Sequence, residues 1–135
     1  MLLIGLIAVL ALSAVVVKKE AMKPYYRSGQ PVPLGSILPL DQVTVNMQDG
    51  HLVQASIALQ LTKVANSKLA TADIPRFENS VITILGAQSY SGLLAPQARA
   101  AVNQEILRAC QGILSTTDGH APQVSAIYFT GFVIQ

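Results

Sequence analysis

The side chains in this sequence that could bind a metal ion or act as a nucleophile are two histidines and one cysteine. His51 and His120 each follow directly after an Asp-Gly pair. Asp and Gly are residues that turns prefer, so we expect both histidines to lie in turns. A metal site usually needs three or four N, O or S ligands, and these three side chains lack ligand spacing. The sequence therefore predicts no metal site and no bound cofactor.

Cys110 is the single cysteine, which excludes a disulfide framework. A reactive thiol needs a polar, electropositive and accessible setting. Cys110 instead falls near the apolar face of a predicted helix, and the nearby Arg108 points to another side of that helix. We interpret Cys110 as a small buried hydrophobic residue.

The motifs that usually identify an enzyme are missing from the sequence. It has no Gly-x-Ser-x-Gly elbow, no phosphate-binding loop and no dinucleotide fingerprint. The acidic residues of the segment 36–135 are scattered and form no pair suited to acid–base chemistry. We therefore predict no catalytic residues, and we expect the protein to act by contact with other molecules.

The composition is that of a protein partly embedded in lipid. Apolar residues make up 51% and charged residues 12% of the 135 residues, whereas soluble domains carry about 25% charged residues. This apolar content excludes intrinsic disorder. The net charge of +2 is too small for a nucleic-acid-binding surface, so we expect no nucleic-acid partner. The length leaves room for one domain.

The apolar excess is concentrated in residues 1–17, which contain no charge and no proline. A helix of this length reaches roughly 25 Å, against a hydrocarbon core of about 30 Å. Lys18 and Lys19 can snorkel to close the difference. We predict a single transmembrane helix in contact with membrane lipid. Its anchor residues are Leu2, Leu3, Ile4, Leu6, Ile7, Val9, Leu10, Leu12, Val15, Val16 and Val17.

A cleaved signal peptide is the alternative interpretation of this segment. It requires a charged region before the apolar core and small residues at the cleavage site. Only Met1 precedes the core here, and Leu12 stands where a small residue belongs, so the pattern favours the anchor. The positive charges all follow the span, and the positive-inside rule would keep that side in the cytoplasm.

Residues 18–35 are rich in proline and glycine and predict an extended, semi-stiff stalk. Proline lacks an N–H donor, so this stretch cannot form an interior strand of a sheet. The triplet Tyr25-Tyr26-Arg27 fits two interpretations equally. It is either an anchor in the lipid headgroup layer or part of a solvated linker.

Residues 36–135 are long enough for one modest hydrophobic core. Apolar and polar residues alternate from Val43 to Met47 and again from Val53 to Leu61. Such alternation is typical of half-buried strands. The Asp-Gly pair between the two segments predicts that they form an antiparallel hairpin.

Two segments with helical periodicity follow. We expect Asp73 to cap the first, with Pro75 in the first turn and Gly86 as the stop. The second opens at Ala95-Pro96 and carries its apolar residues as far as Leu114.

The last predicted strand covers residues 124–134 and is apolar on both faces, which is typical of a central strand. The element order is then β-β-α-α-β. It predicts an α+β domain whose helices pack on one side of the sheet.

The end of the chain carries the most distinctive pattern. It resembles the terminal motif V-x-F-T-x-F-V-x-Q of the flagellar basal-body-associated protein FliL family. The matching residues are Phe129, Thr130, Phe132, Val133 and Gln135. The segments Leu40–Asn46, Leu52–Leu61 and Ile74–Leu85 are similar to the family's first two strands and first helix.

The resemblance implies a single-pass inner-membrane protein of the flagellar basal body with a stomatin-like (SPFH) periplasmic domain. It implies a homo-oligomer, often a ring, around the stator units near the membrane ring of the basal body. Such a protein supports stator engagement, torque and swimming or swarming, without enzymatic activity. The resemblance places residues 36–135 in the periplasm, against the distribution of positive charge. The alternative function is an exported soluble periplasmic binding protein or small hydrolase with a cleaved signal peptide.

Overall fold

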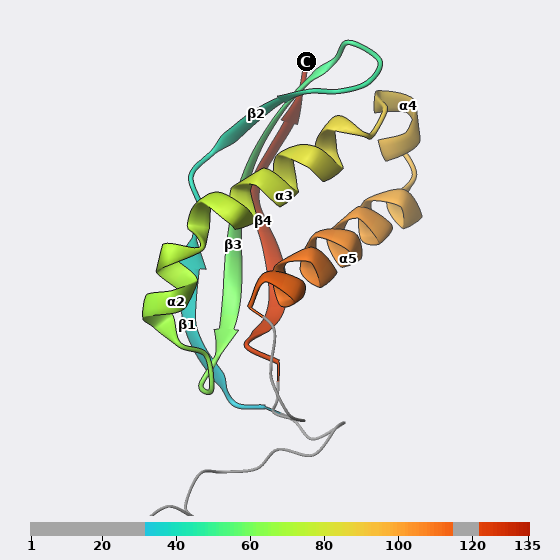
Figure 1. The fold of residues 1–135 in the computed structure, drawn as a ribbon. Coiled ribbons are helices and arrows are strands. Elements are labelled where there is room, and N and C mark those ends of the chain that lie inside the picture. Colours follow the sequence, from blue (N-terminus) through green and yellow to red (C-terminus); the bar gives the residue numbers. More distant parts are fainter. Residues whose placement is uncertain (1–31, 115–121) are drawn as a thin grey trace, which may run out of the picture.

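The computed structural model describes residues 32–114 and 122–135 (Figure 1). The predicted span at 1–17, most of the predicted stalk and His120 lie outside the described residues. Among the helices of the described part, none has the length and apolar character needed to cross a membrane.

The described strands form one antiparallel sheet with a long central strand. Its members are β1 (Leu34–Pro39), β2 (Val43–Asn46), β3 (Leu52–Thr62) and β4 (Val124–Ile134). β4 pairs with one edge of β3 over most of its length. β1 and β2 share the other edge, with β1 beside the C-terminal half of β3 and β2 beside the N-terminal half.

Helices follow β3 and lead to β4. They are α2 (Ser67–Ala72), α3 (Ile74–Gly86), α4 (Tyr90–Leu93) and α5 (Pro96–Ile113). The longer helices α3 and α5 cover one face of the sheet (Figure 1). The α+β prediction is confirmed, together with the stop at Gly86 and the start of α5 after Ala95. The structure adds β1, α2 and α4 to the predicted order.

The predicted hairpin between β2 and β3 is confirmed, with Val45 opposite Val53. The turn closes where the Met47 N–H donates to the His51 carbonyl at 2.8 Å. Gly50 has a φ of 90° in this turn, a backbone conformation that glycine adopts without a steric penalty.

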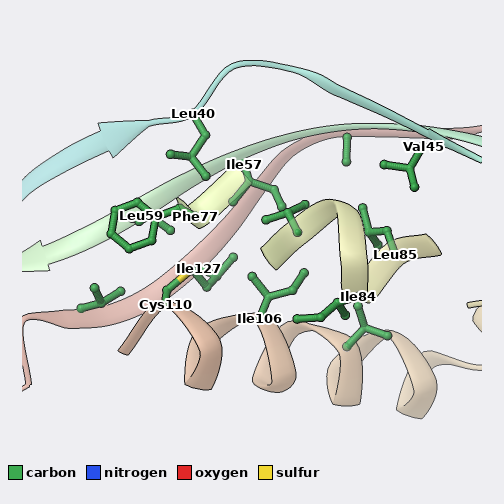
Figure 2. Close-up of a cluster of buried hydrophobic side chains, with 14 of the residues drawn as sticks. Leu40, Val45, Ile57, Leu59, Phe77, Ile84, Leu85, Ile106, Cys110 and Ile127 are labelled. Atoms are coloured by element: carbon green, nitrogen blue, oxygen red, sulfur yellow. The ribbon is translucent and has the colours of Figure 1, made fainter. Parts of the chain in front are cut away.

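The core lies between the sheet and the two longer helices (Figure 2). The odd-numbered residues of β3 all point toward the helices, as the alternation predicts, and each is at most 3% exposed. Phe77 of α3 and Ile106 of α5 are fully buried against them. Burying an aliphatic or aromatic side chain of this size contributes about 1.5–3 kcal/mol, so these contacts fix the positions of the helices.

β1 is a strand that the sequence pattern did not predict. It begins at Leu34, where the proline-rich stretch ends, and it lies at an edge of the sheet. A side chain at Gly35 would meet the Thr62 carbonyl oxygen at 2.6 Å, so this close approach requires glycine. The buried Gln60 amide donates to the carbonyls of Gly35 and Leu61, at 3.0 and 2.9 Å.

The expected side-chain cap at Asp73 is wrong. Asp73 precedes α3, but its carboxylate makes no capping hydrogen bond and lies 3.5 Å from the Arg76 guanidinium. The backbone N–H of Asp73 is instead held by the end of α2. A side-chain cap occurs one helix earlier, where Asn66 accepts from the N–H groups of Lys68 and Leu69, both at 3.1 Å.

The prediction that residues 124–134 form the central strand is also wrong. β3 is central, and β4 has a strand neighbour on one side only among the described residues. Tyr128 and Val133 lie on the sheet face that the helices leave uncovered, and they are 41% and 50% exposed. The apolar residues of β4 therefore belong to one face that packs on the core and one face that is accessible, and they do not make β4 a central strand.

Candidate interaction surface

The candidate interaction surface includes part of β4, and this strand has a bulge at Thr130. Gly131 lies opposite Ser56 and Phe129 lies opposite Ile57, so Thr130 is an extra residue without a partner on β3. In a regular strand, residues three apart point to opposite faces. The extra residue places Phe129 and Phe132 on the same, helix-facing side, opposite Ile57 and Ala55.

A second bulge, at the start of β4, also places two residues that are three apart on the same face. Val124 lies opposite Leu61 and Ala126 lies opposite Gln60, so Ser125 is the extra residue. Val124 and Ile127 are also three apart, and both are buried in the core. The spacing of apolar residues in β4 thus follows from two bulges.

A groove opens between β4 and the N-terminal half of α5, with Phe129 and Phe132 on its β4 side. Its volume is about 460 Å³, within the range of ligand-binding clefts. The two rings make an edge-to-face contact with centroids 5.6 Å apart. α3 and α4 contribute Leu85 and Leu93. The residues from α5 are Arg99, Ala100, Val102, Asn103 and Gln104.

The charge on the groove's lining is positive. Among the described residues that line the groove, Arg99 is the only ionisable one and none is acidic. Within the described part of the chain, the ion pairs formed are Asp49 with His51 and Asp73 with Arg76, and neither involves Arg99. The groove is therefore an apolar cleft with an exposed, unpaired cation on its rim.

The backbone edge of β4 differs along its length. Near its start, amide side chains of α5 cover it. Gln111 donates to the Val124 carbonyl at 3.0 Å, and Asn103 donates to the Ile127 carbonyl at 3.3 Å. Toward the C-terminus of β4, α5 and β4 diverge (Figure 1), and no other described strand pairs with β4 there.

The other residues of the terminal motif do not line this groove. Thr130 is exposed at the bulge, and Val133 lies on the face of the sheet that the helices leave uncovered. Gln135 continues the ladder beyond β4, because it exchanges two backbone hydrogen bonds with Leu52, at 2.9 and 2.8 Å. The structure thus brings the two phenylalanines together at the groove, places Thr130 and Val133 elsewhere on β4, and places Gln135 directly after the strand.

The uncovered sheet face carries two pairs of exposed apolar side chains. Leu34 and Ile37 of β1 are 59% and 56% exposed, and we call them the β1 patch. Tyr128 and Val133 form the β4 patch. All four are opposite even-numbered residues of β3, so the patches share one face and lie at its two opposite edges.

His51 lies at the end of the hairpin turn, as predicted. Its ring stacks on Tyr90 with centroids 4.8 Å apart, and its Nδ1 is 3.1 Å from an Asp49 carboxylate oxygen. The same carboxylate accepts the Tyr90 N–H at 2.8 Å and the His51 N–H at 3.2 Å. This cluster connects the hairpin to α4, and no pattern in the sequence predicted the contact between His51 and Tyr90.

A metal-binding cluster was not found in the described residues: no three His, Cys, Asp or Glu side chains are grouped there. The prediction for Cys110 is confirmed, because its side chain is fully buried in the core. Burial raises the pKa of the Cys110 thiol to about 11.

An α+β domain with an apolar groove, an open strand edge and accessible apolar patches has the surfaces of a protein-interaction domain. The chain matches the flagellar basal body-associated protein FliL family over residues 37–135, and it belongs to that family. No curated protein matches the chain by sequence. Family membership makes it an accessory protein associated with the flagellar basal body, from a family that is not known for enzymes.

Proposed function

We propose that this protein is a membrane-anchored accessory of the flagellar motor that assembles as a homo-oligomeric ring around stator units. In this proposal residues 1–17 span the inner membrane, residues 18–35 include the stalk, and a stomatin-like domain lies in the periplasm. The ring supports stator engagement, and through it torque and motility. Support comes from the family match and from the contact surfaces of the described domain.

The position of residue 32 gives the domain an orientation in this proposal. The chain enters the described domain just before Leu34, which lies opposite Thr62 at the C-terminal end of β3. The groove lies near Phe132, opposite Ala55. At about 3.4 Å per residue, the seven-residue step from Thr62 to Ala55 separates the two by roughly 24 Å. The groove is then on the end of the domain farther from the membrane.

The single observation that carries the ring is the pair of patches at opposite edges of one sheet face. A closed ring needs a heterologous contact, in which one surface of each copy meets a different surface of the next. The β1 patch and the β4 patch meet this requirement, because both are apolar and neither contains a charge. Copies anchored in one membrane also have a high effective concentration, so weak contacts suffice.

Mass photometry of the full-length protein in detergent, alone and with stator units, tests the ring. We expect a closed oligomer for the wild type and loss of that oligomer in Ile37→Glu. The matched control is Ile82→Glu, which changes an apolar side chain of α3 that is 42% exposed away from the sheet. It should assemble normally. Residues 32–135 without the anchor should be mainly monomeric at micromolar concentration.

A full-length protein that stays monomeric both alone and with stator units would contradict the ring. It would leave an accessory role for a monomeric adaptor. Motility on soft agar adds a second readout, because Ile37→Glu should swim less well than Ile82→Glu at equal abundance.

A further inference from the structure

The open part of the β4 edge is identified by the hydrogen-bond pattern of its ladder. Leu52 and Gln135 exchange both of their backbone bonds. In an antiparallel ladder, such pairs alternate with pairs that exchange none. Ile134, opposite Val53, and Phe132, opposite Ala55, therefore direct their backbone N–H and C=O groups away from β3. No other described strand pairs with β4 there.

An edge of this kind is the template for strand addition. The open groups of Phe132 and Ile134 lie beside the groove, which is lined by the side chains of Phe129 and Phe132. A strand added at this edge would present every second side chain to the helix-facing side, where the groove provides an apolar space. Arg99 on the rim has no acidic partner within the described residues and would attract a carboxylate.

We propose that β4 and the groove bind an extended segment of another protein by β-strand addition. The segment has apolar side chains at alternate positions, and these fill the groove over Phe129 and Phe132. One acidic residue of the segment pairs with Arg99. The segment is extended because the edge offers backbone hydrogen bonds in a strand register, which a helix could not use. The proposal goes beyond the ring, whose patches lie on the opposite face of the sheet.

The test uses the full-length protein in detergent and a ten-residue peptide that alternates Val and Thr, with one Val replaced by Asp so that the carboxylate lies on the groove-facing side with Arg99. Hydrogen exchange measured by NMR should show new protection at the amides of Phe132 and Ile134 when the peptide is added. The amide of Val133, which faces β3 in the ladder, should be protected before and after. Fluorescence anisotropy of the labelled peptide gives the affinity.

Two adjacent alanines of α5 provide a matched pair of variants. Ala100 lines the groove and Ala101 does not, and both are exposed. Ala100→Glu should abolish peptide binding by placing a charged side chain in the groove, and Ala101→Glu should bind as the wild type does. Gln104→Arg, which obstructs the same groove by another residue, serves as the second variant if Ala100→Glu fails to fold.

The acidic residue is tested with a second peptide that carries Asn in place of Asp. Arg99→Gln should weaken binding of the Asp peptide by about two- to fivefold, the range for an exposed ion pair, and leave the Asn peptide unchanged. An equal effect on both peptides would overturn the assignment of Arg99.

Other outcomes would overturn the docking site itself. They are absence of binding at millimolar peptide, equal binding by Ala100→Glu and Ala101→Glu, or protection that appears on β1. Protection of Phe132 and Ile134 without peptide would show another occupant. It would be a second copy if the protection grows with protein concentration, and a segment of the same chain if it does not. Mass photometry of Ala100→Glu tests the ring independently of peptide binding. The ring should form normally in this variant even though the peptide does not bind.

Discussion

Phe129 and Phe132 make an edge-to-face contact on the helix-facing side of β4, although they are three residues apart in a strand. The extra residue Thr130 is the physical reason. The F-T-x-F pattern at the end of the chain therefore encodes a bulged strand with two rings on one side.

This contact gives the first prediction. Phe132→Ala removes a half-buried ring and its partner contact, and should lower the free energy of unfolding by about 2 kcal/mol. Its neighbour Val133 is half exposed on the other face, so Val133→Ala should change the free energy by less than about 0.5 kcal/mol. Urea denaturation of both variants measures the difference, and equal losses would contradict the assigned faces.

Asp49 gives the second prediction. The Tyr90 N–H, followed by the interactions with His51, holds the pKa of the Asp49 carboxyl below its ordinary value of 3.8. A lowered pKa contributes stability above the unfolded value, and this contribution is lost as the pH falls below about 3.8. Thermal melting between about pH 5 and about pH 2 should therefore show a steeper loss for the wild type than for Asp49→Asn. Parallel curves would show that the carboxylate does not hold the hairpin to α4.

Cys110 gives the third prediction. Burial raises the pKa of the thiol from 9.0 to about 11, so the folded protein should not react with a thiol reagent at about pH 8. Because the folded pKa is raised, the stability from the neutral thiol is complete below about pH 9. It is lost as the pH rises toward about 11, by at most about 1.4 kcal/mol per pH unit. Cys110→Ala should lack this alkaline loss, and denaturation at several pH values compares the two.

The fourth prediction concerns the anchor. Leu10→Arg places a charge at the centre of the predicted span and should cost about 2.5–3.5 kcal/mol of insertion free energy. The variant should leave the membrane fraction, and Leu10→Phe, which keeps the site apolar, should stay there. Mass spectrometry of the wild type would contradict the anchor by showing a chain cleaved within or just after residues 1–17.

The sequence pattern predicted the elements whose period is regular. The β2–β3 hairpin and the helices α3 and α5 follow from alternation or from a 3.6-residue repeat, and Cys110 followed from its place on α5. β1 was missed because its strand pairing depends on the close approach at Gly35 and on the side chain of Gln60, which are distant in sequence.

The predicted position of β4 at the centre of the sheet was wrong for a related reason. Apolar residues on both sides of the pattern suggested burial, but two bulges alter which residues share a face. The groove could not be predicted either, because its walls come from β4 and from helices that precede it in the chain. The FliL resemblance located Phe129 and Phe132 as residues of interest, and the structure supplied the reason for their spacing.

The two bulges also have a consequence for the length of β4. Its eleven residues extend alongside only nine residues of β3, from Val53 to Leu61. Removing Thr130 would leave Phe129, Gly131 and Phe132 on their present sides with regular alternation, and the same holds for Ser125 between Val124 and Ala126. Deletion of Thr130 or of Ser125 is thus compatible with the same core. In a strand without bulges, deletion of one residue would move every following side chain to the opposite face of the sheet.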